Sequence, residues 1–271
     1  MKPFPVITAR TSLTLLVFCS VFVSHTEAKK PHRQSNRKPI VVELFTSEGC
    51  STCPPADALL RKLEEQQPVP GARVIALEEH VDYWNHQGWI DPFSSPEWTQ
   101  GQEAYVFMLK NGEPYTPEMV VDGQSQFVGS NEREAELTIE RVASGVKTDV
   151  SIMPGKLDGK NSQNFDVSVG KLAGDAPGDV VEVWLAVTED GLHSSVSGGE
   201  NGGRVLYHAA VVRSLHKIGA AHTGGESLSF TGDPRVKFSS KWKRKSLRVV
   251  VFVQKRKSRK ILCAASTRLT Q

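Results

Sequence analysis

Two cysteines separated by two residues are the most chemically informative feature of the sequence. Cys50 and Cys53 are close enough along the chain for their sulfurs to bond. Pro54 and Pro55 follow at once and suit the first turn of a helix, where a missing N–H costs little. The N-terminus of a helix carries partial positive charge, which favours a thiolate over a thiol. The pattern predicts thiol–disulfide exchange, with Cys50 as the exposed attacking thiol and Cys53 as the resolving thiol.

Titratable side chains near the pair are candidates for tuning its chemistry. Glu43 and Glu48 precede Cys50, and either carboxylate could accept the proton of the resolving thiol, although structural roles for buried carboxylates are commoner. His80 and Asp82 follow the next apolar run. His80 could tune Cys50, serve as an ordinary structural histidine, or join both cysteines as a ligand for a soft metal such as copper(I). The last alternative, like a permanent disulfide, would make the protein a non-catalytic binding module.

A Thr-Pro step downstream supplies a second part of the candidate site. Thr116 and Pro117 precede a β-rich run and an Asp-Gly turn, which together predict a hairpin over residues 119–129. In a thioredoxin-like fold, a cis-proline begins the strand that faces the cysteines, and its neighbour's backbone pairs with the substrate. We therefore predict that the Thr116–Pro117 peptide is cis and lies against the Cys50 sulfur. An ordinary trans proline at a strand edge is the alternative.

The sequence around the cysteines predicts a strand–helix–strand unit. Residues 40–45 form a short apolar run that is typical of a buried parallel strand. Apolar residues then recur at three- and four-residue steps, which predicts a helix over 54–63, and residues 73–77 form the second strand. Such a crossover is right-handed. Further helices are expected up to Leu109 and over residues 132–144.

The spacing of apolar residues changes after residue 147. Short alternating apolar runs separated by Gly, Asp and Ser are typical of an antiparallel β domain. These runs cover residues 165–169, 180–187, 205–215, 228–230, 247–254 and 260–265. We expect an α/β thioredoxin-like N-terminal domain over 39–147 and an antiparallel β-rich, sandwich-like C-terminal domain over 148–271. Cys263 falls in the last run and is predicted to be a buried, inert thiol.

An aromatic segment separates the second strand from the helix that ends at Leu109. It contains Trp84, Trp89, Phe93 and Trp98 within residues 80–105. These side chains could form a lid over the cysteines or a small hydrophobic core of their own.

The N-terminus has the pattern of a secretory signal. Lys2 and Arg10 precede an apolar run over 13–23, which is too short to span a bilayer. We predict a signal peptide over 1–28, with an uncleaved anchor as the alternative, and a basic polar linker over 29–38. The mature protein is then exported, either periplasmic or secreted. An oxidising compartment favours a disulfide or redox pair over structural zinc.

The charge balance limits the partners. The formal net charge is +3, which does not call for a polyanionic partner, and no nucleic acid is expected. Residues 235–260 contain twelve Lys and Arg and no Asp or Glu. They could attract an anionic envelope surface, although a solvated hairpin face is the commoner explanation. Expected partners are an exported protein or a small-molecule thiol or disulfide, and the redox interpretation calls for no cofactor.

Five segments resemble, in order, a bacterial family of exported proteins catalogued as domain of unknown function 1223, in the thioredoxin-like superfamily. They are VVELFTSEGCSTCPPADALL, HVDYWNHQGWIDPFSSPEWT, YTPEMVVDGQSQFVGS, GENGGRVLYHAAVVRSL and VVVFVQKRKSRKILCAAS. The resemblance covers about residues 39–266. It implies a thioredoxin-like half carrying Cys50, Cys53 and Pro117, followed by a β-rich half, and it implies no particular reaction.

The chain departs from that family's pattern at two positions. Gly101 stands where an arginine is usual, so a role for that arginine is in doubt here. Cys263 stands where a small residue such as glycine is usual, and it adds a thiol with no implied function.

Overall fold

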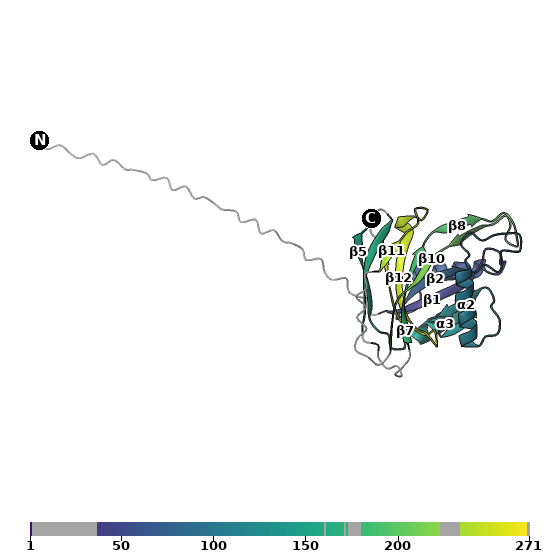
Figure 1. Ribbon diagram of the computed structural model, residues 1–271, viewed down its shortest axis with the longest axis horizontal. Helices are drawn as coiled ribbons and strands as arrows, with labels where there is room; N and C mark the ends of the chain where they lie inside the picture. The colour runs from purple at the N-terminus through teal and green to yellow at the C-terminus, as the bar shows by residue number, and fades with distance from the viewer. Residues whose placement is uncertain (2–36, 160, 171, 173–179, 223–233, 270–271) are drawn as a thin grey trace. The chain divides into compact units, whose positions relative to one another are not determined.

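A computed structural model describes residues 1, 37–159, 161–170, 172, 180–222 and 234–269. Apart from Met1, the expected signal peptide lies outside these residues, as does most of the expected linker. The described residues from Arg37 onward form one compact unit (Figure 1). Among the described residues, no helix is both long enough and apolar enough to cross a membrane.

The first half of this unit alternates strands and helices. Its elements are β1 (Lys38–Thr46), α1 (Pro54–Gln66), β2 (Ala72–His80), α2 (Pro96–Leu109), β3 (Glu118–Val121), β4 (Ser125–Val128) and α3 (Glu132–Ala143). Strand β1 pairs parallel to β2 and antiparallel to β3, and β3 pairs with β4. The predicted strand–helix–strand unit, hairpin and last helix are confirmed. The hairpin turn places Asp122 and Gly123 at φ of 49° and 63°, the positive angles that an Asp-Gly turn accommodates.

The second half is built from strands. They are β5 (Val150–Leu157), β6 (Ser162–Val169), β7 (Val180–Glu189), β8 (Leu192–Ser195), β9 (Val205–His208), β10 (Val211–His222), β11 (Arg235–Lys237), β12 (Leu247–Lys255) and β13 (Ile261–Arg268), with a short 3-10 helix η1 (Arg244–Ser246) before β12. Pairing among these strands is antiparallel, as the sequence predicts. The strand expected over 228–230 lies outside the described residues.

The two halves share one sheet, in contrast to the two domains expected over 39–147 and 148–271. The order in the eight-stranded sheet is β13-β12-β7-β10-β2-β1-β3-β4. Strand β10 joins β2 in parallel at Val211 and Glu78, and Glu78 N donates to Ala210 O over 3.0 Å. The apolar pattern of β2 shows that the strand is buried but does not show which distant strand pairs with its second edge, so the sequence alone suggested a boundary here.

Helices cover one part of this sheet and a second sheet covers the other. Helices α1 and α3 pack on one face of β1 and β3, while Tyr105 and Trp98 of α2 pack on the opposite face. The three-stranded sheet β11-β6-β5 packs on β7, β12 and β13, which gives the second half a sandwich arrangement (Figure 1). Cys263 is fully buried in this core, which confirms the predicted burial, and burial raises the pKa of its thiol to about 12.

The apolar run over 205–215, expected as one strand, is divided between β9 and β10. Ala210 adopts a φ of 56° at the division. Ala209 N donates to Glu78 Oε2 over 2.9 Å, and Ala210 N donates to Asp190 Oδ1 over 3.0 Å. Two carboxylates thus bind backbone N–H groups that a continuous strand would have used for ladder pairing.

Candidate functional site: a buried disulfide and its surroundings

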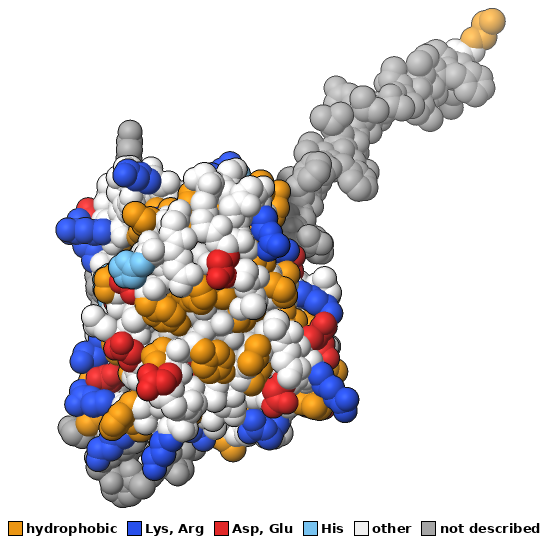
Figure 2. Space-filling view, turned by 90° about the vertical axis from the view of Figure 1, so that its right-hand side faces the viewer, with side chains coloured by type: hydrophobic (Ala, Val, Ile, Leu, Met, Phe, Trp, Pro, Cys, Tyr) orange, Lys and Arg blue, Asp and Glu red, His pale blue; other side chains and the backbone are white. Residues whose placement is uncertain are grey.

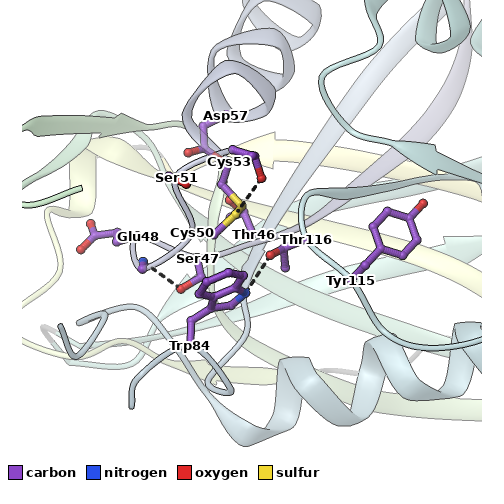
Figure 3. Close-up of a disulfide and its surroundings, with 12 residues drawn as sticks. Thr46, Ser47, Glu48, Cys50, Ser51, Cys53, Asp57, Trp84, Tyr115 and Thr116 are labelled. Atoms are coloured by element: carbon purple, nitrogen blue, oxygen red, sulfur yellow. Dashed lines mark hydrogen bonds between the residues drawn. A yellow bond between two sulfur atoms is a disulfide. The ribbon is translucent and has the colours of Figure 1, made fainter. Parts of the chain in front are cut away.

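Cys50 and Cys53 form a disulfide with a Cα–Cα separation of 5.5 Å (Figure 3). Cys53 is the N-cap of α1, and Pro54 and Pro55 occupy the first helical positions. Proline has no N–H, and the next N–H, of Ala56, donates to Cys53 O over 2.8 Å. The prolines therefore start the helix, but they offer no N–H donors to a thiolate at this helix end.

Thr52 provides a different donor to the reactive sulfur. Its Oγ1 lies 3.3 Å from Cys50 Sγ. A disulfide sulfur has no proton, so the Thr52 hydroxyl is the donor in this contact. Nothing in the sequence indicates this role, because Thr52 is one of the two residues that separate the cysteines.

Both cysteines are buried, so the expectation of an exposed Cys50 is wrong. Their exposed fractions are 1% and 0%. The loop between β8 and β9 covers the turn that carries them: Asn201 Nδ2 donates to Cys50 O over 2.9 Å, and Ser51 N donates to Glu200 Oε2 over 3.0 Å. The covering loop comes from about 150 residues away in the sequence, beyond the reach of any local pattern.

Trp84 packs over the same turn from the aromatic segment. A Cβ built on Gly49 would lie 3.0 Å from Trp84 Cβ, which shows how closely the two residues approach. The indole Nε1 donates to Thr116 Oγ1 over 2.8 Å, linking the cysteine turn to the Thr-Pro step (Figure 3). Trp98 instead is buried in the core under α2. The aromatic segment thus contributes both to the cover of the cysteine turn and to a core.

The Thr116–Pro117 peptide is cis, as predicted. Phe45 pairs with Glu118, so the register brings Pro117 opposite the last residue of β1. A Cβ on Gly129 would lie 3.3 Å from Pro117 Cβ and 3.2 Å from Ala56 Cβ. Pro117 and the first turn of α1 therefore pack around the same glycine, while contact between Pro117 and the Cys50 sulfur stays a prediction.

Asp57 is a buried carboxyl that the sequence analysis missed. It lies one helical turn after Cys53, and Thr46 Oγ1 donates to its Oδ1 over 2.6 Å. Burial, followed by repulsion from Glu78, raises the pKa of Asp57 to about 7. The sequence could have predicted this burial, because Asp57 lies on the helix face formed by Ala56 and the buried leucines of α1.

Two of the sequence-predicted tuning residues lie elsewhere. Glu43 faces α2, where Tyr105 OH donates to its Oε2 over 2.6 Å, and burial raises the pKa of Glu43 to about 7. Asp82 Oδ1 accepts from Thr99 Oγ1 over 2.6 Å and thereby holds the first turns of α2. Glu43 is thus on the face of the sheet opposite to α1, the helix that begins beside the cysteines.

The other two candidates, Glu48 and His80, belong to a buried network. His208 Nε2 contacts Glu48 Oε1 at 3.0 Å, and its Nδ1 contacts Glu78 Oε1 at 2.8 Å. His80 Nδ1 contacts Asp91 Oδ2 at 2.7 Å. Burial alone would lower the pKa of His208, but the Glu78 charge and the two carboxylate hydrogen bonds raise it to about 9. His208 and Glu78 were not singled out from the sequence.

Aromatic side chains enclose this network. Phe93 packs edge-on against the His80 and His208 rings, with centroids 5.3 and 5.5 Å apart. Trp89 Nε1 donates to Glu48 Oε2 over 2.8 Å. Phe93 and Trp89, expected either as a lid over the cysteines or as a core, therefore contact the histidines and Glu48.

The basic segment over 235–260 is partly paired within the chain. Arg235 contacts Asp158 at 2.6 Å, Arg256 contacts Glu182 at 2.8 Å, and Arg248 forms an ion pair with Glu64. The face shown in Figure 2 has charged side chains of both signs around a central group of apolar side chains. Pairing of this kind reduces the net charge that the segment presents to an outside anion.

The fold and the site define a mixed α/β protein with a disulfide between the end of a strand and the start of a helix. The chain belongs to the DUF1223 family of proteins of unknown function, whose sequence profile matches residues 41–254. A search of curated proteins finds no match.

Solved structures similar to the chain include two that align over most of its length. The crystal structure of protein AGR_C_4864 from Agrobacterium tumefaciens shares 26% identity, covers 87% of this chain and 98% of its own, and superposes with a TM-score of 0.61. HBP35 of Porphyromonas gingivalis shares 18% identity, covers 86% of this chain and 76% of its own, and has a TM-score of 0.57. At that identity the second likeness concerns the fold alone.

Proposed function

We propose that the protein is an exported thiol–disulfide oxidoreductase in which Cys50 and Cys53 cycle between a disulfide and a dithiol. The observation that carries the proposal is the position of the disulfide, between the end of β1 and the N-cap of α1. The order β2-β1-β3-β4, with the cis-proline before β3, supports the thioredoxin-like arrangement that the family resemblance implies. The charged and apolar segments over 1–28 support export.

The exchange step needs only the two cysteines and a partner. In the reducing direction, the Cys50 thiolate attacks one sulfur of a partner disulfide, and the partner's other sulfur leaves as a thiolate. Cys53 then loses its proton and attacks the Cys50 sulfur, which releases the second partner thiol and restores the Cys50–Cys53 disulfide. Two electrons pass to the partner, and the reverse sequence oxidises a partner dithiol.

Two neighbouring groups suit this chemistry. The Thr52 hydroxyl already donates to Cys50 Sγ and would stabilise the Cys50 thiolate in the reduced protein. Asp57 lies one turn after Cys53, is buried, and has a pKa of about 7, which suits a group that accepts the Cys53 proton near neutral pH.

Burial of the disulfide defines what a partner must do. A partner that reaches Cys50 must displace part of its cover, which includes Trp84 and the loop that carries Asn201 and Glu200. The hydrogen bonds involved are few, so displacement by a bound polypeptide costs a few kcal/mol. A permanent structural disulfide is the competing function, because it would use the same cover without opening.

Turnover of a model disulfide by the purified protein, with a small dithiol as the electron donor, distinguishes an oxidoreductase from a structural disulfide. Cys50→Ser should abolish turnover, and Cys53→Ser should accumulate mixed disulfides with partner thiols, because attack occurs without resolution. Cys263→Ser is the matched control and should change neither. Equal loss of thermal stability from Cys50→Ser and Cys53→Ser, with no adducts and no turnover by the wild type, would leave only the structural function.

A further inference from the structure

Glu78, His80 and His208 converge in the interior of the fold. Their side chains are at most 1% exposed, and one donor atom from each lies within 4.8 Å of the others. Glu78 and His80 are two residues apart in β2 and so project from the same face, while His208 ends β9. The three residues come from segments 130 positions apart in the sequence.

His80 Nε2 is the most informative atom of the group. It is buried, and no described residue forms a hydrogen bond with it. The nearest acidic oxygen, Glu78 Oε1, is 3.6 Å away, too far for a good hydrogen bond. A buried polar atom without a partner costs about 1–3 kcal/mol, so the arrangement points to a ligand that this nitrogen contacts.

One ring nitrogen of each histidine contacts a carboxylate outside the three-residue group. His80 Nδ1 contacts Asp91 Oδ2, and His208 Nε2 contacts Glu48 Oε1. These contacts leave His80 Nε2 and His208 Nδ1 as the atoms on the Glu78 side of each ring. Metal-binding histidines are characteristically oriented in this way, with the other ring nitrogen hydrogen-bonded to a carboxylate.

One member of the group, His208, also lines a cavity. This cavity of about 940 Å³ lies beside α1 and is lined by Arg61, Asp190, Tyr207 and His208, among others. The cavity lining includes neither cysteine, and it includes neither Glu78 nor His80.

We propose that Glu78, His80 and His208 bind one divalent late first-row transition-metal ion, with zinc as the reference ion. Two imidazole nitrogens and one carboxylate oxygen suit Zn²⁺ or Co²⁺, whereas Ca²⁺ and Mg²⁺ prefer all-oxygen sites and copper(I) prefers sulfur. Three protein ligands leave a fourth position for water. The site shares only His80 with the cysteine-based copper site considered from the sequence, and it does not depend on the proposed redox function.

The test is metal binding by the chelator-stripped, purified protein. We expect one equivalent of Zn²⁺ to bind in competition with a chromophoric chelator, and Co²⁺ to give visible d–d bands without a thiolate charge-transfer band. Glu78→Gln and His208→Asn should abolish this binding, and Asp91→Asn should weaken it about 10–100-fold. The exposed His216→Asn is the matched control and should bind normally. Cys50→Ser should also bind normally, which separates this result from failure of disulfide exchange.

Folding is checked by circular dichroism and thermal unfolding of each variant. The wild-type measurement does not depend on the variants, so a folded wild type that binds no stoichiometric Zn²⁺ or Co²⁺ overturns the proposal. Retained binding in folded Glu78→Gln and His208→Asn, or its loss in His216→Asn, overturns it equally.

Discussion

The side-chain amide of Asn201 donates a 2.9 Å hydrogen bond to the carbonyl oxygen of Cys50, a residue 151 positions earlier. The same amide donates to Glu48 O over 2.9 Å, and Asn201 is fully buried. Arg204 Nη1 in turn donates to Asn201 Oδ1 over 2.9 Å. One residue of the β-rich half thus fixes the backbone on both sides of Gly49, and the halves of the chain meet at the disulfide.

Asn201→Ala should make the disulfide easier to reduce. The substitution removes both hydrogen bonds from the Asn201 amide to the cysteine turn, so the covering loop should open more often. The free energy of unfolding should fall by about 1–3 kcal/mol. We expect the rate of reduction by dithiothreitol to rise several-fold. The exposed Ser197→Ala, in the same loop, is the control and should leave the rate unchanged. A rate equal to the wild type in folded Asn201→Ala would show that this loop does not limit access.

Thr52→Val should raise the pKa of the Cys50 thiol in the reduced protein. Valine keeps the shape of threonine but removes the hydroxyl that donates to Cys50 Sγ. A hydrogen bond to a charged group is worth about 1.5–3 kcal/mol, which corresponds to roughly one to two pKa units. The pH dependence of iodoacetamide alkylation measures the change. Thr52→Ser keeps the donor and should resemble the wild type, so identical profiles for valine and serine would contradict the assigned role.

Local features of the site could be predicted because neighbouring residues determine them. Two prolines after Cys53 predict the start of α1, and an Asp-Gly pair predicts the hairpin that follows the cis-proline. In these cases the residue types restrict the backbone angles directly, so the local sequence is enough to predict the start of the helix and the turn.

Relationships between distant segments could not be predicted in the same way. Nothing near Glu78 in the sequence indicates that His208 and the backbone of Ala209 will contact its carboxylate. Burial of Cys50 was missed for the same reason, since its cover comes from the far half of the chain. Glu43 was misplaced relative to the cysteines because closeness in sequence does not show which face of β1 a side chain occupies.

Glu43→Gln should flatten the pH dependence of stability between about pH 4.5 and 7. Burial raises the pKa of Glu43 from 4.5 to about 7, so the folded state binds more protons than the unfolded state in this interval. The stabilising contribution is therefore complete below pH 4.5 and is lost as the pH rises through 7, with a slope of at most ~1.4 kcal/mol per pH unit. The groups that act on Glu43 are Tyr105, Arg259, Asp122, Glu118 and Glu79.

Urea unfolding at a series of pH values measures this slope. Glutamine can still accept the Tyr105 hydrogen bond but cannot titrate, so the variant should gain stability relative to the wild type as the pH rises. The exposed Glu103→Gln on α2 controls for loss of a carboxylate. Parallel curves for Glu43→Gln and the wild type would show that Glu43 does not titrate in this interval.

Gly101→Arg should stabilise the fold by pairing with Glu79. A Cβ at Gly101 would lie in ordinary contact, 3.7 Å from Glu79 Oε2, and Glu79 Oε1 is buried without a hydrogen-bond partner among the described residues. Burial, followed by repulsion from Glu43, raises the pKa of Glu79 well above its usual value, even though Arg259 lowers it. Gly101→Ala should gain about 1 kcal/mol from helix propensity alone, and arginine should add about 1.5–3 kcal/mol through a charge-assisted hydrogen bond. Denaturant unfolding of both variants, alone and combined with Glu79→Gln, isolates the pairing energy. The pairing is contradicted if Gly101→Arg is no more stable than Gly101→Ala, or if the extra stability of Gly101→Arg persists when Glu79 is replaced by Gln.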